Sequence, residues 1–588
     1  MKLIAACMAV LMTTTGIAAA EPQKNPEETK LYQIIDREWE WMLQEFPNAA
    51  TYVGDPRYDD LWPDSSPEAI ERREEHARAL VDELEGLDRE RLSPEGRLNY
   101  DLMLRNARLT VEAQKFPGEL VPLNQMGGVH QDVADLLQMQ PRRTVEEYEK
   151  VIQRLRGVAT LVDQDIALMR RGLEAGVTPP RITLRDVEKR IAELVVDDPA
   201  QSSIYEVAFD QMPSSISSAE QKRLREEAAK VIRESVIPAY GRLQQFFAKE
   251  YYPGTREAIG LSSVPDGRSW YDYQVRVMTT TDMTSDEIHQ LGLSEVKRIR
   301  GEMESIRKQT GFEGTLQEFF DFLRTDPRFF YTDKEELLAG YRNIAKRIDP
   351  ELTRLFGKLP RLTYGVLPVP EYSERTQTTA YYQPGSPEAR RPGYFYANTW
   401  DLASRPKWEM EALTVHEAVP GHHLQISLAQ ELENVPSFRR HGGYTAFVEG
   451  WGLYSESLGP ELGLYTDPYS KFGQLTYEMW RAIRLVVDTG MHAKGWTRDQ
   501  AIQYFKENAG KSEHDIRVEI DRYIVWPGQA LAYKIGELKI KELRALATRE
   551  LGEKFDIRGF HDTVLGAGPL PLSILETRVR EWIASEKG

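Results

Sequence analysis

The feature that most constrains this chain is the repeated occurrence of short motifs that begin α-helices. Capping boxes, in which Ser or Thr is followed three residues later by Glu or Gln, begin at Thr144, Ser217, Thr284, Thr332 and Thr497. Ser66-Pro67 and Ser93-Pro94 are further helix starts, because proline is favoured at the first helical position. Charged segments with apolar residues at helical spacing, such as residues 68–87, lie between these motifs. The sequence therefore predicts a mainly α fold.

One stretch departs from this pattern. Residues 360–400 are rich in Pro, Tyr and Thr and contain short β-type runs bounded by Pro and Gly, which predicts a small sheet of two or three strands. A turn-rich stretch, residues 251–266, is a candidate boundary. We expect an N-terminal helical half over residues 21–255 and a C-terminal catalytic half over residues 256–588, and a single large lobed domain is the alternative.

Residues 1–20 have the features of a secretory signal peptide. Lys2 precedes an apolar stretch that ends in Ala18-Ala19-Ala20. The only cysteine, Cys7, lies within this segment, so the mature chain has no disulfide. We expect a periplasmic or secreted bacterial protein without a stable membrane anchor. The formal net charge of −17 argues against nucleic acid as a partner. The sequence does not indicate the oligomeric state.

The sequence HEAVPGHHLQ, residues 416–425, is the strongest candidate for a functional motif. In the common zinc-peptidase motif, two histidines four residues apart bind one ion from the same helical face, and Glu lies between them. Here the histidines after His416 are six and seven residues away, and on an unbroken helix neither reaches the same ion. Pro420 and Gly421 favour a break in the helix. Such a break would bring a second histidine to the metal, and the sequence alone leaves His422 and His423 as alternatives.

A third ligand is predicted in YTAFVEGWGLYSESLG. Glu449 lies 27 residues after His422, and Glu456 lies on the same helical face. His416, His422 and Glu449 would supply two nitrogens and one carboxylate to one Zn²⁺ with a position left for water, which is typical of catalytic zinc. Glu417 would be the general base, and Glu456 would orient a metal ligand. Gly450 and Gly452 would allow close helix packing.

The chain resembles the bacterial proteins catalogued as domain of unknown function 885, which look like relatives of the thermolysin-type (gluzincin-like) zinc metallopeptidase clan. The resemblance covers most of the mature chain and is densest in VPDGRSWYDYQVRVMTTTDMTSDEIHQLGLSEV, NTWDLASRPKWEMEALTVHEAVPGHHLQ, YTAFVEGWGLYSESLG and DRYIVWPGQALAYKIGELKI. The family pattern H-E-x-x-P-G-H-x-x-Q favours His422 over His423. The resemblance implies one zinc ion and peptide hydrolysis.

Five other residues are candidates for roles in peptide hydrolysis. Tyr523 and His492 are candidate donors to the developing oxyanion, with structural roles as the alternative. Arg522 and Tyr533 are candidates for binding a substrate carboxylate, and Tyr382 for lining the cleft. Two other functions fit the same metal site. One is hydrolysis of other amides or esters, including cell-wall peptides, and the other is non-catalytic peptide binding in the periplasm around a structural metal.

Overall fold

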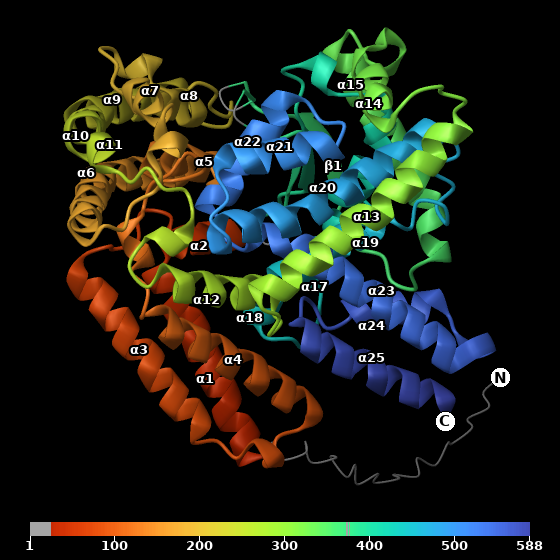
Figure 1. The fold of residues 1–588 in the computed structure, drawn as a ribbon. Helices are drawn as coiled ribbons and strands as arrows, with labels where there is room; N and C mark the ends of the chain where they lie inside the picture. Colours follow the sequence, from red (N-terminus) through yellow and green to blue (C-terminus); the bar gives the residue numbers. More distant parts are fainter. Residues whose placement is uncertain (1–24, 372–373, 376, 388) are drawn as a thin grey trace, which may run out of the picture.

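The computed structural model describes residues 25–371, 374–375, 377–387 and 389–588 (Figure 1). The predicted signal peptide, residues 1–20, lies outside the described residues. The predicted mainly α fold is confirmed, with one small sheet. Among the described residues, no helix is both long and apolar enough to cross a lipid bilayer.

The first eleven α-helices precede the turn-rich stretch or lie at its start. They are α1 Pro26–Glu45, α2 Pro47–Val53, α3 Pro67–Glu85, α4 Pro94–Ala113, α5 Val129–Met139, α6 Val145–Ala175, α7 Val187–Ala192, α8 Ser203–Phe209, α9 Ser218–Val231, α10 Ile237–Phe246 and α11 Tyr252–Gly254. Helices α1, α3 and α4 lie side by side (Figure 1) and share an apolar cluster, while α5, α6 and α8–α10 surround a second one.

The remaining α-helices and the sheet share the largest apolar core. The helices are α12 Gly267–Thr279, α13 Ser285–Gln309, α14 Leu316–Thr325, α15 Lys334–Ile348, α16 Met410–Glu417, α17 His422–Gln430, α18 Ser437–Arg440, α19 Thr445–Glu456, α20 Pro468–Ala493, α21 Arg498–Asn508, α22 Glu513–Val525, α23 Ala532–Leu551, α24 Ile557–Leu565 and α25 Leu572–Lys587. Helix α20 is central, because every residue from Phe472 to His492 is buried.

Most of the predicted helix starts are confirmed. The side chains of Thr144, Thr284 and Thr497 cap α6, α13 and α21 in complete capping boxes. Ser66, Ser93 and Ser217 also cap helices. The predicted start at Thr332 is wrong by one residue. The carboxylate of Asp333 accepts the Glu336 backbone N–H at 3.0 Å, and α15 therefore begins at Lys334.

The predicted sheet has three strands, β1 Tyr364–Pro368, β2 Ala380–Gln383 and β3 Gly393–Ala397. Strand β3 lies in the middle, parallel to β1 and antiparallel to β2, with Phe395 opposite both Val366 and Tyr382. Helix α15 packs against β1, and α16 packs against β2 and α20. The sheet and α20 thereby support α16, the first helix of the histidine-rich motif.

Candidate metal centre

The helix that begins the HEAVPGHH motif breaks at Pro420-Gly421. Helix α16 ends at Glu417, and α17 begins at His422. Between them the backbone leaves helical geometry at Ala418 (φ −99°, ψ −108°) and Gly421 (φ −73°, ψ −129°). The Gly421 N–H still donates to the Val415 carbonyl at 2.9 Å, so the chain folds back tightly on the end of α16. The break turns two histidines six residues apart towards one point.

Gly421 is required at this break by close backbone contact. A Cβ atom added there would lie 1.9 Å from the carbonyl oxygen of His416, well inside van der Waals contact. The break is also fixed from outside by α19. The Trp451 indole N–H donates to the Pro420 carbonyl at 2.8 Å, and the Ser455 hydroxyl reaches the same oxygen at 3.4 Å. Helix α19 therefore holds the loop whose shape determines where His422 points.

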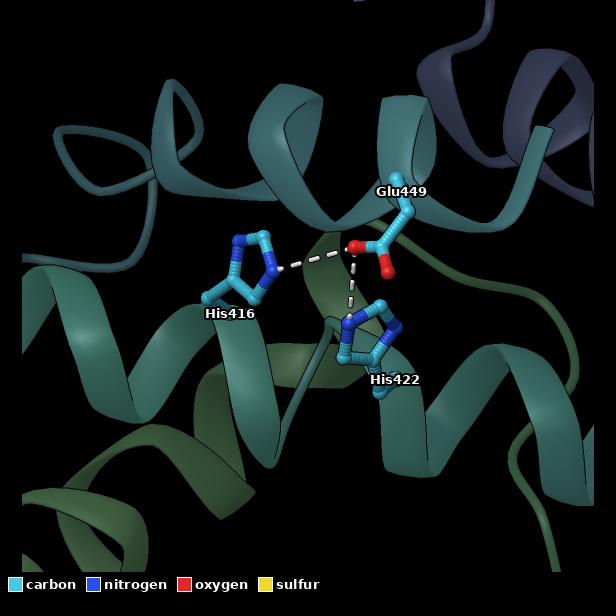
Figure 2. Close-up of side chains that lie close together, drawn as sticks. All are labelled: His416, His422 and Glu449. Carbon is cyan, nitrogen blue, oxygen red and sulfur yellow. Dashed lines mark ion pairs between the residues drawn. The ribbon is translucent and has the colours of Figure 1, made fainter. Parts of the chain in front are cut away.

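His416, His422 and Glu449 converge as the sequence predicts (Figure 2). Glu449 Oε2 lies 3.3 Å from His422 Nε2 and 3.7 Å from His416 Nε2. Tetrahedral ligands at bonds of ~2.1 Å from a metal are separated by about 3.4 Å, which is close to both distances. Within the described part of the chain, this is the only group of three His, Cys, Asp or Glu residues whose ligand atoms come this close together.

The carboxylates and imidazoles of this group shift one another's pKa values. Burial alone lowers the pKa of His416, but the carboxylates of Glu449 and Glu456 raise it to about 9. Burial raises the pKa of Glu449, but His422 and His416 hold it well below its usual range. Glu449 Oε2 is buried and has no hydrogen-bond partner among the described residues. A buried carboxylate oxygen facing two imidazole nitrogens is a fitting donor for a divalent metal ion.

Glu456 contacts His416 from the side of the ring opposite Glu449, which agrees with the position predicted from the sequence. Its Oε1 atom is 2.8 Å from His416 Nδ1, and the other ring nitrogen of His416 faces Glu449. Arg481 NH2 lies 3.3 Å from the same carboxylate oxygen. A carboxylate on the far nitrogen fixes the orientation and protonation of a ligating histidine. Gly452 makes room for this ring, because a Cβ atom there would lie 2.8 Å from His416 Cε1.

The three converging side chains line a cleft of about 300 Å³. Glu417 lines the same cleft and is 8% exposed, and its carboxylate makes no hydrogen bond or ion pair with any residue that the structure describes. Buried carboxylates are normally paired. The unpaired carboxylate of Glu417 therefore makes it a candidate to interact with a bound molecule.

The structure also distinguishes His422 from His423. The Nδ1 atom of His423 lies 2.8 Å from the Tyr382 hydroxyl, and its ring packs 4.5 Å from that of Tyr364, so it faces the sheet. Burial lowers the pKa of His423 to about 4. His422, and not His423, is therefore the histidine that converges with His416 and Glu449.

Three of the five other predicted residues line the cleft, namely Tyr382, Arg522 and Tyr533. Tyr523 and His492 do not line the cleft, so the prediction that either donates to an oxyanion there is not supported by their positions. The Tyr523 hydroxyl accepts from Arg484 at 2.7 Å and donates to Glu519 at 2.6 Å inside the core. His492 is fully buried, and its two ring nitrogens contact the Leu261 N–H and the Tyr523 carbonyl, each at 2.9 Å.

Three charged residues that line the cleft, Arg481, Arg484 and Glu519, were not predicted from the sequence. Arg481 and Arg484 come from α20, and Glu519 comes from α22. The sequence does mark these residues. In EMWRAIRLVV and VEIDRYIV, charged residues three positions apart occur among large apolar residues. Such charges are seldom buried unless they are paired or bind a ligand.

Comparisons with known proteins place the chain in a family of undefined function. A crystal structure described as "the putative lipoprotein from Colwellia psychrerythraea" shares 29% identity and a TM-score of 0.90, covering 95% of this chain and 99% of that one. A "putative lipoprotein of unknown function from Shewanella oneidensis" shares 18% identity and a TM-score of 0.69, covering 93% and 99%, and shows the fold alone. No curated protein matches the sequence. The chain belongs to the family described as "Bacterial protein of unknown function (DUF885)", whose model matches residues 47–579.

Proposed function

We propose that the protein hydrolyses peptide bonds with one zinc ion bound by His416, His422 and Glu449. The observation that carries the proposal is the convergence of these three side chains at the wall of a cleft, with the partnerless carboxylate of Glu417 beside them. A group of two imidazoles and one carboxylate is typical of catalytic zinc, whereas structural zinc normally has four protein ligands. Among the described residues, no fourth His, Cys, Asp or Glu joins the group.

Each side chain then has a defined task. When bound, zinc activates a water molecule and polarises a carbonyl group. Glu417, which is free of other partners, accepts the proton of the attacking water and returns it to the leaving amine. Glu456 keeps the Nε2 atom of His416 directed at the metal, because it contacts Nδ1 at 2.8 Å.

The ligand set and the position of Glu417 next to the first histidine support a relationship to the thermolysin-type metallopeptidase clan as part of this proposal. A periplasmic or secreted location is also proposed. It rests on the predicted signal peptide and agrees with the description of both structural neighbours as "putative lipoprotein". Peptide substrates are supported by the edge strand β2, because its residues Ala380, Tyr381 and Tyr382 line the cleft and an extended peptide can pair with such a strand.

The test measures the zinc content of the purified protein and its hydrolysis of peptides. Wild-type protein purified in zinc-containing buffer should hold one zinc ion and cleave a mixed peptide library. Glu417→Gln should keep the zinc and lose activity by ~10²–10⁴-fold. Glu411→Gln is the matched control, because Glu411 lies on the same helix but bonds to Arg347 and does not line the cleft.

Two outcomes would overturn the proposal. A wild-type protein that does not retain zinc would show that the three side chains do not form the site. If zinc is retained but wild type and Glu417→Gln are equally inert on peptides, other amides and esters, the hydrolase proposal fails and the alternative of non-catalytic peptide binding is favoured. Cleavage of esters or cell-wall peptides alone would keep the metal chemistry but change the substrate.

A further inference from the structure

One part of the cleft wall carries an unusual concentration of positive charge. Arg481 and Arg484, one helical turn apart on α20, and Arg522 on α22 all line the cleft. Each of these three residues is at most 8% exposed. Charged groups buried to this degree require compensation by opposite charges or hydrogen bonds.

The carboxylates nearby compensate the arginines only in part. Arg481 is paired with Glu456 at 3.3 Å. Arg484 and Arg522 share a single carboxylate, that of Glu519, at 3.0 Å and 3.3 Å. Their other side-chain partners, the hydroxyls of Tyr523 and Tyr533 and the amide of Gln529, are neutral. This part of the wall therefore has two positive charges against one negative charge.

The Arg484 guanidinium has a donor atom that could bind a further negatively charged group. Its Nε donates to the Tyr523 hydroxyl, its NH2 binds Glu519, and its guanidinium carbon lies 4.3 Å from the centre of the Tyr533 ring. Its NH1 atom is buried and has no hydrogen-bond partner among the described residues. The guanidinium is thus held rigidly while one donor stays unused, although an unpaired buried donor is costly.

We propose that Arg484, together with Arg522, binds a carboxylate of the peptide substrate. The inference rests on the proposed peptidase function and deepens it, because it defines the substrate class as peptides with a negative charge close to the scissile bond. A carboxylate supplies both the missing charge and an acceptor for the Arg484 NH1 donor. It comes either from a free C-terminus or from an Asp or Glu side chain.

The position of Arg484 limits the distance between this carboxylate and the scissile bond. The centre of the Tyr533 ring, 4.3 Å from the Arg484 guanidinium carbon, lies 6.4 Å from that of His416. The guanidinium is therefore at most about 11 Å from the His416 ring, the length of about three extended residues. The carboxylate belongs to a residue within about three positions of the cleaved bond. For a free C-terminus, cleavage would release one to three residues.

The experiment compares three peptides of one sequence without internal acidic residues. The first has a free C-terminal carboxylate, the second a C-terminal amide, and the third the amide with one Glu placed after the cleaved bond. Binding is measured by calorimetry on zinc-loaded Glu417→Gln, and kcat/KM is measured on wild type. The free acid should bind and be cleaved about 10- to 100-fold better than the plain amide, as expected for one hydrogen-bonded ion pair.

The third peptide identifies the source of the charge. If it matches the free acid, the site accepts acidic side chains, and if it matches the plain amide, the site reads the C-terminus. Equal binding of all three peptides would overturn the inference and leave the proposed peptidase function intact. If zinc-loaded wild type cleaves none of them but Glu417→Gln still prefers a carboxylate, the peptidase function fails and the anion site stands.

Substitutions test the assignment to Arg484. Arg484→Gln, and separately Arg522→Gln, should reduce the ratio of free acid to amide towards one. Arg405→Gln is the matched control, because Arg405 is also buried but does not line the cleft. Thermal melting establishes that each variant is folded. A folded Arg484→Gln protein with the wild-type ratio would overturn the assignment, and Arg522→Gln provides the same test if Arg484→Gln does not fold.

Discussion

Replacing Glu456 by Gln tests whether the buried carboxylate behind His416 serves metal binding. Glu456 is fully buried, and its Oε1 atom lies 2.8 Å from His416 Nδ1 and 3.3 Å from Arg481 NH2. Glutamine has nearly the same size and retains a carbonyl oxygen, so the His416 ring can keep its position. The substitution removes the negative charge that makes the imidazole a stronger donor to a cation.

The expected loss has two parts. Removing a carboxylate partner of a ligating histidine typically weakens metal binding by 10–100-fold, or about 1.4–2.7 kcal/mol. The buried guanidinium of Arg481 also loses its counter-ion, and breaking a buried pair in this way costs about 3–5 kcal/mol of folding stability. The remaining bond from Arg481 NH1 to the Tyr477 carbonyl at 3.2 Å should keep the stability loss at the lower end of that range.

Zinc affinity is measured by competition with a chromophoric chelator at pH 7.5, and folding is followed by thermal melting of the metal-free protein. Glu409→Gln is the control, because Glu409 is buried and paired with Lys511 but does not touch the metal-binding group. It should lose stability and keep its zinc affinity. A folded Glu456→Gln protein with wild-type zinc affinity would refute the role of Glu456 in orienting His416.

Two further predictions concern the space around the metal and the buried histidines. Gly452→Ala places a methyl group 2.8 Å from His416 Cε1 and 3.0 Å from Nε2, so zinc affinity should fall at least ~10-fold in the same competition assay. Gly301→Ala, where a methyl group meets nothing within 4 Å, should leave it unchanged. Burial lowers the pKa of His130 and His561 to about 3 and that of His492 to about 4. These histidines are neutral in the fold and take up protons on unfolding below pH ~6.5, so each should reduce the unfolding free energy by about 2 kcal/mol between pH 7 and pH 5. Burial raises the pKa of Asp165 and Asp488 to about 7, which acts in the opposite direction. The contribution of one histidine is therefore measured by urea denaturation of metal-free wild type and His561→Gln at both pH values, and an equal pH dependence of the two proteins would contradict it.

The metal-binding group was predictable because it depends on short stretches of sequence. The spacing of His416 and His422 excludes a straight helix, and Pro420-Gly421 marks the only place where the intervening turn can break. Glu449 follows on the next long helix. Local chain geometry and the chemistry of the ligand set therefore limit the arrangements to two, with His422 or His423 as the second histidine, and the resemblance to the family pattern favours His422.

The rest of the cleft was predicted poorly because it depends on how distant helices are rotated. Arg522 and Tyr523 are neighbours in sequence, but adjacent residues on a helix point about 100° apart, and only Arg522 faces the cleft. His492 lies eight residues beyond Arg484 on α20, about 12 Å along the axis, and so lies past the cleft. Sequence patterns predicted that the segments now seen as α20 and α22 contribute to the site, but they did not predict which face of each helix borders the cleft.

The geometry of the metal-binding group is concentrated in one helix, α19. Glu449 supplies a ligand, Trp451 and Ser455 bond to the Pro420 carbonyl that shapes the break, Gly452 makes room for the His416 ring, and Glu456 orients that ring. The two histidines come from α16 and α17, but their positions depend on contacts with this helix. The three side chains that we propose bind zinc therefore all depend on the position of α19.

The packing behind α19 extends this dependence away from the cleft. A Cβ atom on Gly450 would lie 2.5 Å from the Cα of Gly536, so α19 and α23 touch through their backbones. Helix α23 also carries Tyr533, whose ring centre lies 6.4 Å from that of His416 and 4.3 Å from the Arg484 guanidinium carbon. The close contact of α19 with α23 therefore fixes the position of Tyr533, which lies between the His416 ring and the Arg484 guanidinium that we propose binds the substrate carboxylate.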